Sequence, residues 1–120
     1  MDTIKQNIDI IVPCYNEEDV LHLFFTETSK IIDSITDYNW RYIFVDDGSR
    51  DKTLPILREL ANNNENVTYI SFSKNFGKEA AMYAGLNHST GDYVIIMDAD
   101  LQHPPALIPD MLSGIKEGYD

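Results

Sequence analysis

The sequence predicts an α/β fold in which a doubly wound, mostly parallel sheet is covered by helices on both faces. Two observations lead to this prediction. Short, apolar, β-branched runs alternate with segments of helical character, and the alternation occurs four times, as βαβαβαβα. Runs that are apolar along their whole length are typical of parallel strands buried between two helical layers. The 120 residues, 43% of them hydrophobic, suffice for one domain with a core.

The four predicted strands are the apolar runs, each of which ends at a turn signal followed by a helical segment. They lie at Asp9–Val12, Tyr42–Val45, Val67–Phe72 and Tyr93–Met97.

The helices are predicted from the spacing of apolar residues. Between Val20 and Ile35 these recur at three- and four-residue intervals, which indicates an amphipathic helix, with Asn16 in the position of an N-cap. Apolar residues from Leu54 to Ala61 mark a second helix, and 80–86 form a third, shorter one. A fourth is expected to open at a proline pair and to bury the apolar residues behind it: Pro104, Pro105, Leu107, Ile108, Met111, Leu112 and Ile115.

Charge and cysteine content exclude some classes of function. Nine basic and twenty acidic side chains give a net charge of −11, which argues against nucleic-acid binding and is compatible with binding a divalent cation. Cys14 is the single cysteine, so no internal disulfide forms, and we expect a reducing, cytoplasmic compartment. No apolar run approaches the roughly 20 residues that span a bilayer, so we expect these residues to be soluble.

Polar residues collect where the predicted strands end. Ligands of open parallel sheets bind beyond the carboxyl ends of the strands. Four loops should therefore face one cleft: 13–17, 46–49, 73–78 and 98–102. Together they carry five side chains able to be carboxylates.

Asp98 and Asp100 form the candidate metal site. With the Gln102 carbonyl and a substrate diphosphate, two carboxylates can complete the oxygen shell of Mg²⁺ or Mn²⁺. A bare Asp-x-Asp is more often a solvated turn, but its position after an apolar strand and beside other acids favours a metal.

The other loops allow both structural and functional interpretations. Residues 46–49 suit a simple turn, or they offer a carboxylate acceptor to a nucleobase or ribose. Tyr15 can cover a base, and Glu17 can accept from a ribose. A phosphate can rest near Lys74 and Lys78 at a helix start. The sequence has neither a P-loop nor a G-x-G-x-x-G fingerprint.

Taken together, four stretches resemble the family 2 glycosyltransferases, which have the Rossmann-like GT-A fold. They are 12–17 (VPCYNE), 45–49 (VDDGS), 75–79 (NFGKE) with 84–86 (AGL), and 97–102 (MDADLQ) followed by Pro104. The third and fourth look most like the polyprenyl-phosphate branch, which includes dolichol-phosphate mannose synthases and bactoprenol glucosyltransferases.

The resemblance implies a role for each matching position. Pro13, Tyr15 and Glu17 would line the nucleoside pocket, and Val45 and Asp47 would contact the base. Lys78 joins these donor-binding residues because of its place at a helix start. Asp98, Ala99 and Asp100 would meet the sugar-nucleotide diphosphate. The catalytic residues would be Asp98 and Asp100, and the metal, Mg²⁺ or Mn²⁺, would be held by Asp98, Asp100 and Gln102.

The resulting functional expectation is an inverting, metal-dependent hexose transfer from a nucleotide sugar, with UDP-glucose favoured over a GDP-sugar. The acceptor would be a polyprenyl phosphate or another glycan or lipid. Alternatives are transfer to a saccharide hydroxyl in cell-surface polysaccharide synthesis, a Mg²⁺-binding receiver-like signalling domain, a sugar nucleotidyltransferase, and a non-catalytic nucleotide-sugar-binding module.

Residues 1–120 are expected to be the donor-binding, N-terminal portion of such an enzyme. The acceptor side of GT-A enzymes comes from later sequence, so this chain alone should be inactive or weakly active. The full-length protein is expected at the cytoplasmic face of a membrane, and any membrane contact would come from sequence outside these residues.

Overall fold

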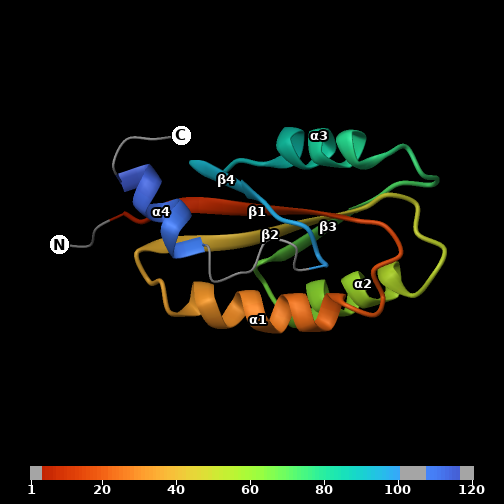
Figure 1. The fold of residues 1–120 in the computed structure, drawn as a ribbon, viewed down its shortest axis with the longest axis horizontal. Helices are drawn as coiled ribbons and strands as arrows, with labels where there is room; N and C mark the ends of the chain where they lie inside the picture. The colour runs from red at the N-terminus through yellow and green to blue at the C-terminus, as the bar shows by residue number, and fades with distance from the viewer. Residues whose placement is uncertain (1–3, 101–107, 117–120) are drawn as a thin grey trace.

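A parallel sheet forms the centre of the computed structural model, which describes residues 4–100 and 108–116. In those residues four strands align in the order β3-β2-β1-β4, and every neighbouring pair is parallel. The strands are β1 (Gln6–Cys14), β2 (Tyr38–Asp46), β3 (Val67–Ser71) and β4 (Tyr93–Ile96). They run in one direction, so their carboxyl ends meet at one edge of the sheet (Figure 1).

Helices cover both faces of this sheet, as predicted. They are α1 (Leu21–Asp33), α2 (Thr53–Asn63), α3 (Lys78–His88) and α4 (Ile108–Lys116). Figure 1 shows α3 above the sheet and α1 and α2 below it, with α4 near the beginning of β1. None of the helices in 4–100 and 108–116 is long and apolar enough to cross a membrane.

The alternation of side chains along the strands divides the core in two. The larger part, shared with α1, α2 and α4, contains Ile8, Ile10, Val12, Tyr42, Phe44, Ile95 and Met97 among others. The smaller part lies under α3 and contains Ile11, Ile43, Val45 and Ala81.

Gly85 allows α3 to lie close to the sheet. A Cβ at this position would be 2.5 Å from Cγ2 of Ile11 in the middle of β1, so a side chain there would push the helix away. The close packing matters for the site because α3 begins at Lys78, beyond the carboxyl ends of the strands.

The elements depart from the predictions mainly at their ends. β1 and β2 each extend over nine residues, longer than the apolar runs that predicted them. The prediction of Asn16 as an N-cap is wrong: α1 starts at Leu21, and its N-cap, Val20, makes no side-chain capping bond. Asn16 instead adopts a left-handed conformation, with φ of 52°, and accepts a hydrogen bond from the backbone N–H of Arg50. The predicted opening of the fourth helix, at Pro104 and Pro105, lies outside the described residues.

A buried carboxylate links the middle of β1 to the loop between α3 and β4. Asp9 accepts two hydrogen bonds from Arg41, at 3.1 and 3.0 Å, one from the Ser89 hydroxyl at 2.6 Å and others from the backbone N–H groups of Thr90 and Gly91. Burial raises the pKa of Asp9, but these donors and the charge of Arg41 outweigh it, so the net pKa is lowered from 3.8.

We expect Asp9→Asn to reduce the free energy of unfolding at neutral pH by about 2–4 kcal/mol. The substitution leaves the Arg41 guanidinium group without the carboxylate that neutralises it. The pKa of Asp9 is lower in the folded state than in the unfolded state, so its ionised form stabilises the fold at pH values above the unfolded-state pKa. This stabilisation is lost as the pH falls through the folded-state pKa. Urea unfolding between about pH 5 and pH 3 should therefore depend less on pH in the variant than in the parent chain. Asp33→Asn, at an exposed position, is the control and should change neither quantity.

Candidate active site

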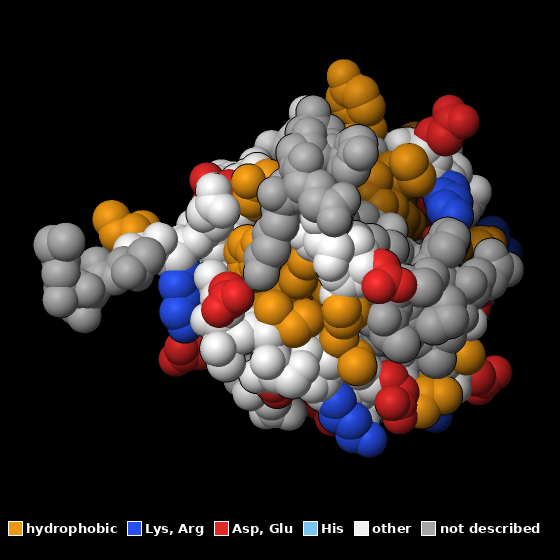
Figure 2. Space-filling view, turned by 60° about the vertical axis from the view of Figure 1, so that its left-hand side comes forward, with side chains coloured by type: hydrophobic (Ala, Val, Ile, Leu, Met, Phe, Trp, Pro, Cys, Tyr) orange, Lys and Arg blue, Asp and Glu red, His pale blue; other side chains and the backbone are white. Residues whose placement is uncertain are grey.

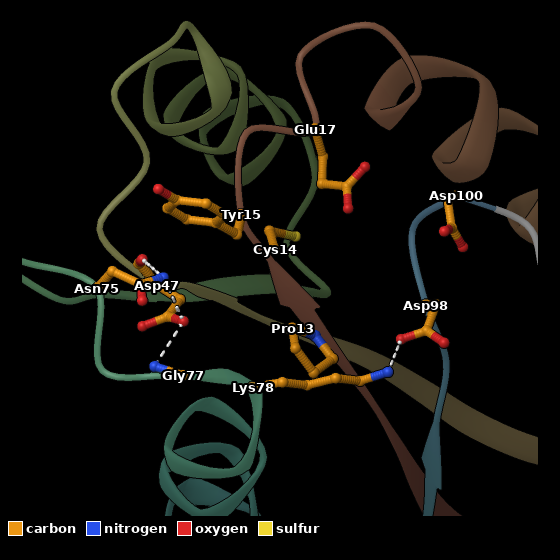
Figure 3. Close-up of a pocket in the computed structure, with 10 residues that line it drawn as sticks. All are labelled: Pro13, Cys14, Tyr15, Glu17, Asp47, Asn75, Gly77, Lys78, Asp98 and Asp100. Carbon is orange, nitrogen blue, oxygen red and sulfur yellow. Dashed lines mark hydrogen bonds and ion pairs between the residues drawn. The ribbon is translucent and has the colours of Figure 1, made fainter.

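A pocket of about 340 Å³ lies at the carboxyl edge of the sheet. Each of the four strand–helix junctions contributes to its lining (Figure 3). The lining residues are Pro13, Cys14, Tyr15, Glu17, Asp47, Asn75, Gly77, Lys78, Asp98 and Asp100. The four predicted loops therefore meet in one cleft.

The first loop is held in place by hydrogen bonds to the second. The backbone N–H of Asn16 donates to the Ser49 hydroxyl at 2.8 Å, and that of Glu17 donates to the Thr53 hydroxyl at 2.8 Å. These bonds set the path of the chain on both sides of Tyr15 and Glu17. Part of the 46–49 turn thus positions the neighbouring loop.

Asp47 connects the second junction to the third. The residue is 3% exposed. Its carboxylate accepts hydrogen bonds from the backbone N–H of Phe76 at 2.7 Å, the backbone N–H of Gly77 at 3.0 Å and the Asn75 side chain at 2.9 Å. Figure 3 shows the Asp47 carboxylate directed at this loop. Asp47 therefore fixes the segment that leads into α3.

Gly48 brings the backbones of the same two loops into contact. It has φ of +71°, and a Cβ there would collide with the backbone carbonyl carbon of Lys74 and lie 2.5 Å from the backbone nitrogen of Asn75. No other residue type allows this approach without movement of the main chain.

The fourth junction carries the aspartate pair. Asp98 and Asp100 both line the pocket, and Asp98 Oδ1 is 2.7 Å from the ammonium nitrogen of Lys78 (Figure 3). The Asp98 side chain is 18% exposed and that of Lys78 60%. Lys78, the first residue of α3, therefore reaches across the pocket to the end of β4.

Negative charge dominates the pocket. Its described lining includes four carboxyl groups, those of Glu17, Asp47, Asp98 and Asp100, against the single ammonium group of Lys78. Burial raises the pKa of Glu17, and the charges of Asp100, Asp98 and Asp51 raise it further. A bound cation would relieve this repulsion.

The chemistry of the donor set fits a hard divalent cation. Carboxylate oxygens are the ligands that Mg²⁺ and Mn²⁺ prefer, and Asp98 and Asp100 supply them. Within the described part of the chain no group of three His, Cys, Asp or Glu side chains is placed to hold one ion. The remaining ligands would have to come from elsewhere, such as a diphosphate. The third predicted ligand, Gln102, lies outside the described residues.

Most residues predicted to bind the donor line the pocket, but Lys74, Val45 and Ala99 do not. Val45 is buried in the core under α3, and Ala99 is buried in the larger core, so neither side chain faces the pocket.

Sequence reasoning missed Cys14, Asn75 and Gly77 as lining residues, although all three lie within the loops that it singled out. Burial, followed by the charges of Glu17 and Asp46, raises the pKa of the Cys14 thiol, which favours its neutral form.

The sequence is similar to known glycosyltransferases over most of its length. The family model "Glycosyl transferase family 2" matches residues 9–120. "Putative glycosyltransferase CsbB" of Bacillus subtilis is 47% identical over 94% of this chain and 34% of its own length. "Bactoprenol glucosyl transferase" of Shigella phage SfX is 40% identical over 94% of this chain and 37% of its own length. The chain thus spans about a third of the length of these curated relatives.

Solved structures of similar fold contain nucleotides and manganese. A mannosyltransferase from Pyrobaculum calidifontis, in complex with GDP-Man and Mn²⁺, is 28% identical with a TM-score of 0.67, over 82% of this chain and 28% of its own. Glucosyl-3-phosphoglycerate synthase from Mycobacterium tuberculosis, in complex with Mn²⁺, UDP and glucosyl-3-phosphoglycerate, is 25% identical with a TM-score of 0.64, over 92% of this chain and 39% of its own. The predicted α/β fold of the GT-A type is confirmed, and the chain belongs to glycosyl transferase family 2.

Proposed function

We propose that this chain binds the nucleotide-sugar donor, with UDP-glucose favoured, of an inverting, metal-dependent hexosyltransferase. The observation that carries the proposal is the meeting of four strand–helix junctions in one acidic pocket, with an aspartate pair opposite a lysine at a helix start. A diphosphate with a divalent cation matches this arrangement, because the cation offsets the carboxylates and the lysine offsets the phosphates.

Four of the lining residues would contact the nucleotide in this proposal. Tyr15 covers the face of the base, and Glu17 accepts a hydrogen bond from a ribose hydroxyl. Asp47 holds the β3–α3 loop against the base, and an acceptor position on its carboxylate serves a nucleobase N–H group. The ammonium group of Lys78 binds the diphosphate.

Asp98, Asp100 and Gln102 would hold Mg²⁺ or Mn²⁺. When bound, this ion acts as a Lewis acid that offsets the negative charge of the departing diphosphate. The two aspartates would position this ion from the end of β4, and Lys78 supplies positive charge to the diphosphate from the opposite wall of the pocket.

A polyprenyl phosphate is the acceptor that we favour. The support is the name of the bactoprenol glucosyl transferase relative, together with one chemical consideration. A phosphate monoester is anionic at neutral pH, so it can attack the anomeric carbon with little help from a general base, whereas a saccharide hydroxyl needs one. The full-length protein would then work at the cytoplasmic face of a membrane.

We further propose that residues 1–120 are the donor half of the catalytic domain. The chain spans about a third of its curated relatives. Strand β4 forms one edge of the described sheet, and its Val94 and Ile96 are 37% and 36% exposed on the face that carries α3. Figure 2 shows hydrophobic side chains at the surface on that side, the top of the view. Further sequence that covers this edge would complete the acceptor site.

Calorimetric titration with UDP-, GDP- and dTDP-sugars, each with Mn²⁺ or with EDTA, tests donor binding. We expect a UDP species to bind with Mn²⁺ and to lose at least about tenfold in affinity with EDTA, because the metal links the diphosphate to the aspartates. If none of these nucleotides binds in the presence of Mn²⁺, the proposed function is wrong. Stronger binding of a GDP-sugar would correct only the identity of the donor. Rapid glucosylation of a polyprenyl phosphate by the chain alone would contradict the donor-half proposal.

A further inference from the structure

The Lys78–Asp98 ion pair places a cation of the protein on a carboxylate proposed to bind metal. The 2.7 Å contact joins the first residue of α3 to the end of β4, across the pocket. Among the described residues that line this pocket, Lys78 is the single cationic side chain. In the donor-free protein, its ammonium group therefore supplies positive charge beside the aspartate pair.

The main chain at Lys78 is fixed, whereas the side chain has room to move. Asp47 binds the backbone N–H groups of the two preceding residues, Phe76 and Gly77, and so anchors the start of α3. The Lys78 side chain is 60% exposed and ends in a compact charge on a flexible four-carbon stem. The ammonium group can therefore change partners while the helix stays in place.

We propose that Lys78 is an exchangeable counter-ion, which pairs with Asp98 in the donor-free protein and transfers to the donor diphosphate when a divalent cation binds at the aspartates. This inference rests on the proposed function and adds to it a coupling between the metal and the donor. The ammonium group and a divalent cation repel each other at neighbouring oxygens of one carboxylate. A metal that binds alone must therefore displace the lysine from its partner, and the displaced ammonium group meets no phosphate.

The diphosphate removes this obstacle because it offers the displaced lysine a new anionic partner. Nucleotide should then strengthen metal binding, and by thermodynamic reciprocity the metal should strengthen nucleotide binding by the same factor. The pKa of Glu17 agrees with this geometry: burial raises it most, and the charges of Asp100 and Asp98 raise it further even with Lys78 in place. The pocket is therefore not fully neutralised by the lysine.

The test measures the Mn²⁺ affinity of the parent chain, Lys78→Met and Lys30→Met by calorimetry, with and without UDP. Lys30 pairs with Glu27 at 3.7 Å on the surface of α1, so its variant removes the same charge and an ion pair away from the pocket. In Lys78→Met, Mn²⁺ alone should bind about three- to tenfold more tightly, because the Lys78 ammonium group no longer competes for the Asp98 carboxylate. UDP at saturating Mn²⁺ should bind about tenfold more weakly. Lys30→Met should match the parent in both measurements.

Each result has a distinct meaning. If the parent binds UDP with Mn²⁺ but Lys78→Met binds Mn²⁺ alone no more tightly than the parent, the counter-ion exchange is wrong and the proposed function stands. If the parent does not bind UDP with Mn²⁺, the proposed function fails first. Equal effects of Lys30→Met and Lys78→Met would also overturn the exchange, since general charge would then explain both. Thermal unfolding of each variant verifies that it is folded.

Discussion

Asp100→Asn is expected to lower the affinity for UDP in the presence of Mn²⁺ by roughly a hundredfold, because it removes a charged ligand from the proposed metal. Asp98→Asn should lower it similarly. The neutral amide keeps the size of each side chain, so a loss of affinity reports the missing charge. Asp33→Asn, at an exposed position of α1, is the matched control and should leave the affinity unchanged. Calorimetric titration of UDP at saturating Mn²⁺ measures all three.

With EDTA in place of Mn²⁺, neither variant should bind UDP more weakly than the parent chain. The aspartates act through the metal in this account, so they contribute little to nucleotide binding without it. If Asp100→Asn and Asp33→Asn bind UDP with the same affinity in Mn²⁺, the assignment of the aspartate pair is wrong.

Asp47→Asn is expected to cost about 2–3 kcal/mol in the free energy of unfolding, because an amide nitrogen would then face part-buried N–H donors. The backbone N–H groups of Phe76 and Gly77 and the side chain of Asn75 all depend on this carboxylate. Release of the β3–α3 loop would also move Lys78, so UDP affinity should fall by at least about tenfold. Urea unfolding and calorimetry under folding conditions measure the two effects separately.

Asn75→Ala is the graded control for this prediction. It removes the side-chain bonds to Asp47 and leaves both backbone donors in place, so it should cost about 1 kcal/mol and weaken UDP binding less. A variant Asp47→Asn with the stability and UDP affinity of the parent would contradict the role of Asp47 as an anchor of the loop.

The fold and the place of the site could be predicted because both depend on local patterns. Apolar periodicity marks the strands and helices, and parallel strands bring their carboxyl ends to one edge. The two predicted binding residues whose side chains are buried, Val45 and Ala99, are a different case. Their assignment rests on their place in the family motifs, which does not report which way a side chain points, and Val45 lies in the core under α3.

The connections between the loops could not be predicted from local patterns. Asparagine is a common N-cap residue, yet the conformation of Asn16 is determined by tertiary hydrogen bonds to Ser49 and Arg50. The pairing of Lys78 with Asp98 likewise depends on how closely α3 packs on the sheet, through Gly85, which is a long-range property. Such contacts involve residues far apart in sequence, so no periodicity reports them.

A crystal structure of the chain with UDP and Mn²⁺, with anomalous diffraction recorded to locate the manganese, shows whether metal and nucleotide share the pocket formed by the four junctions. We expect one manganese peak between Asp98 and Asp100, with the diphosphate between the metal and Lys78 and the uracil beside Tyr15. If manganese binds elsewhere, or if UDP binds outside this pocket, the proposed donor site is wrong.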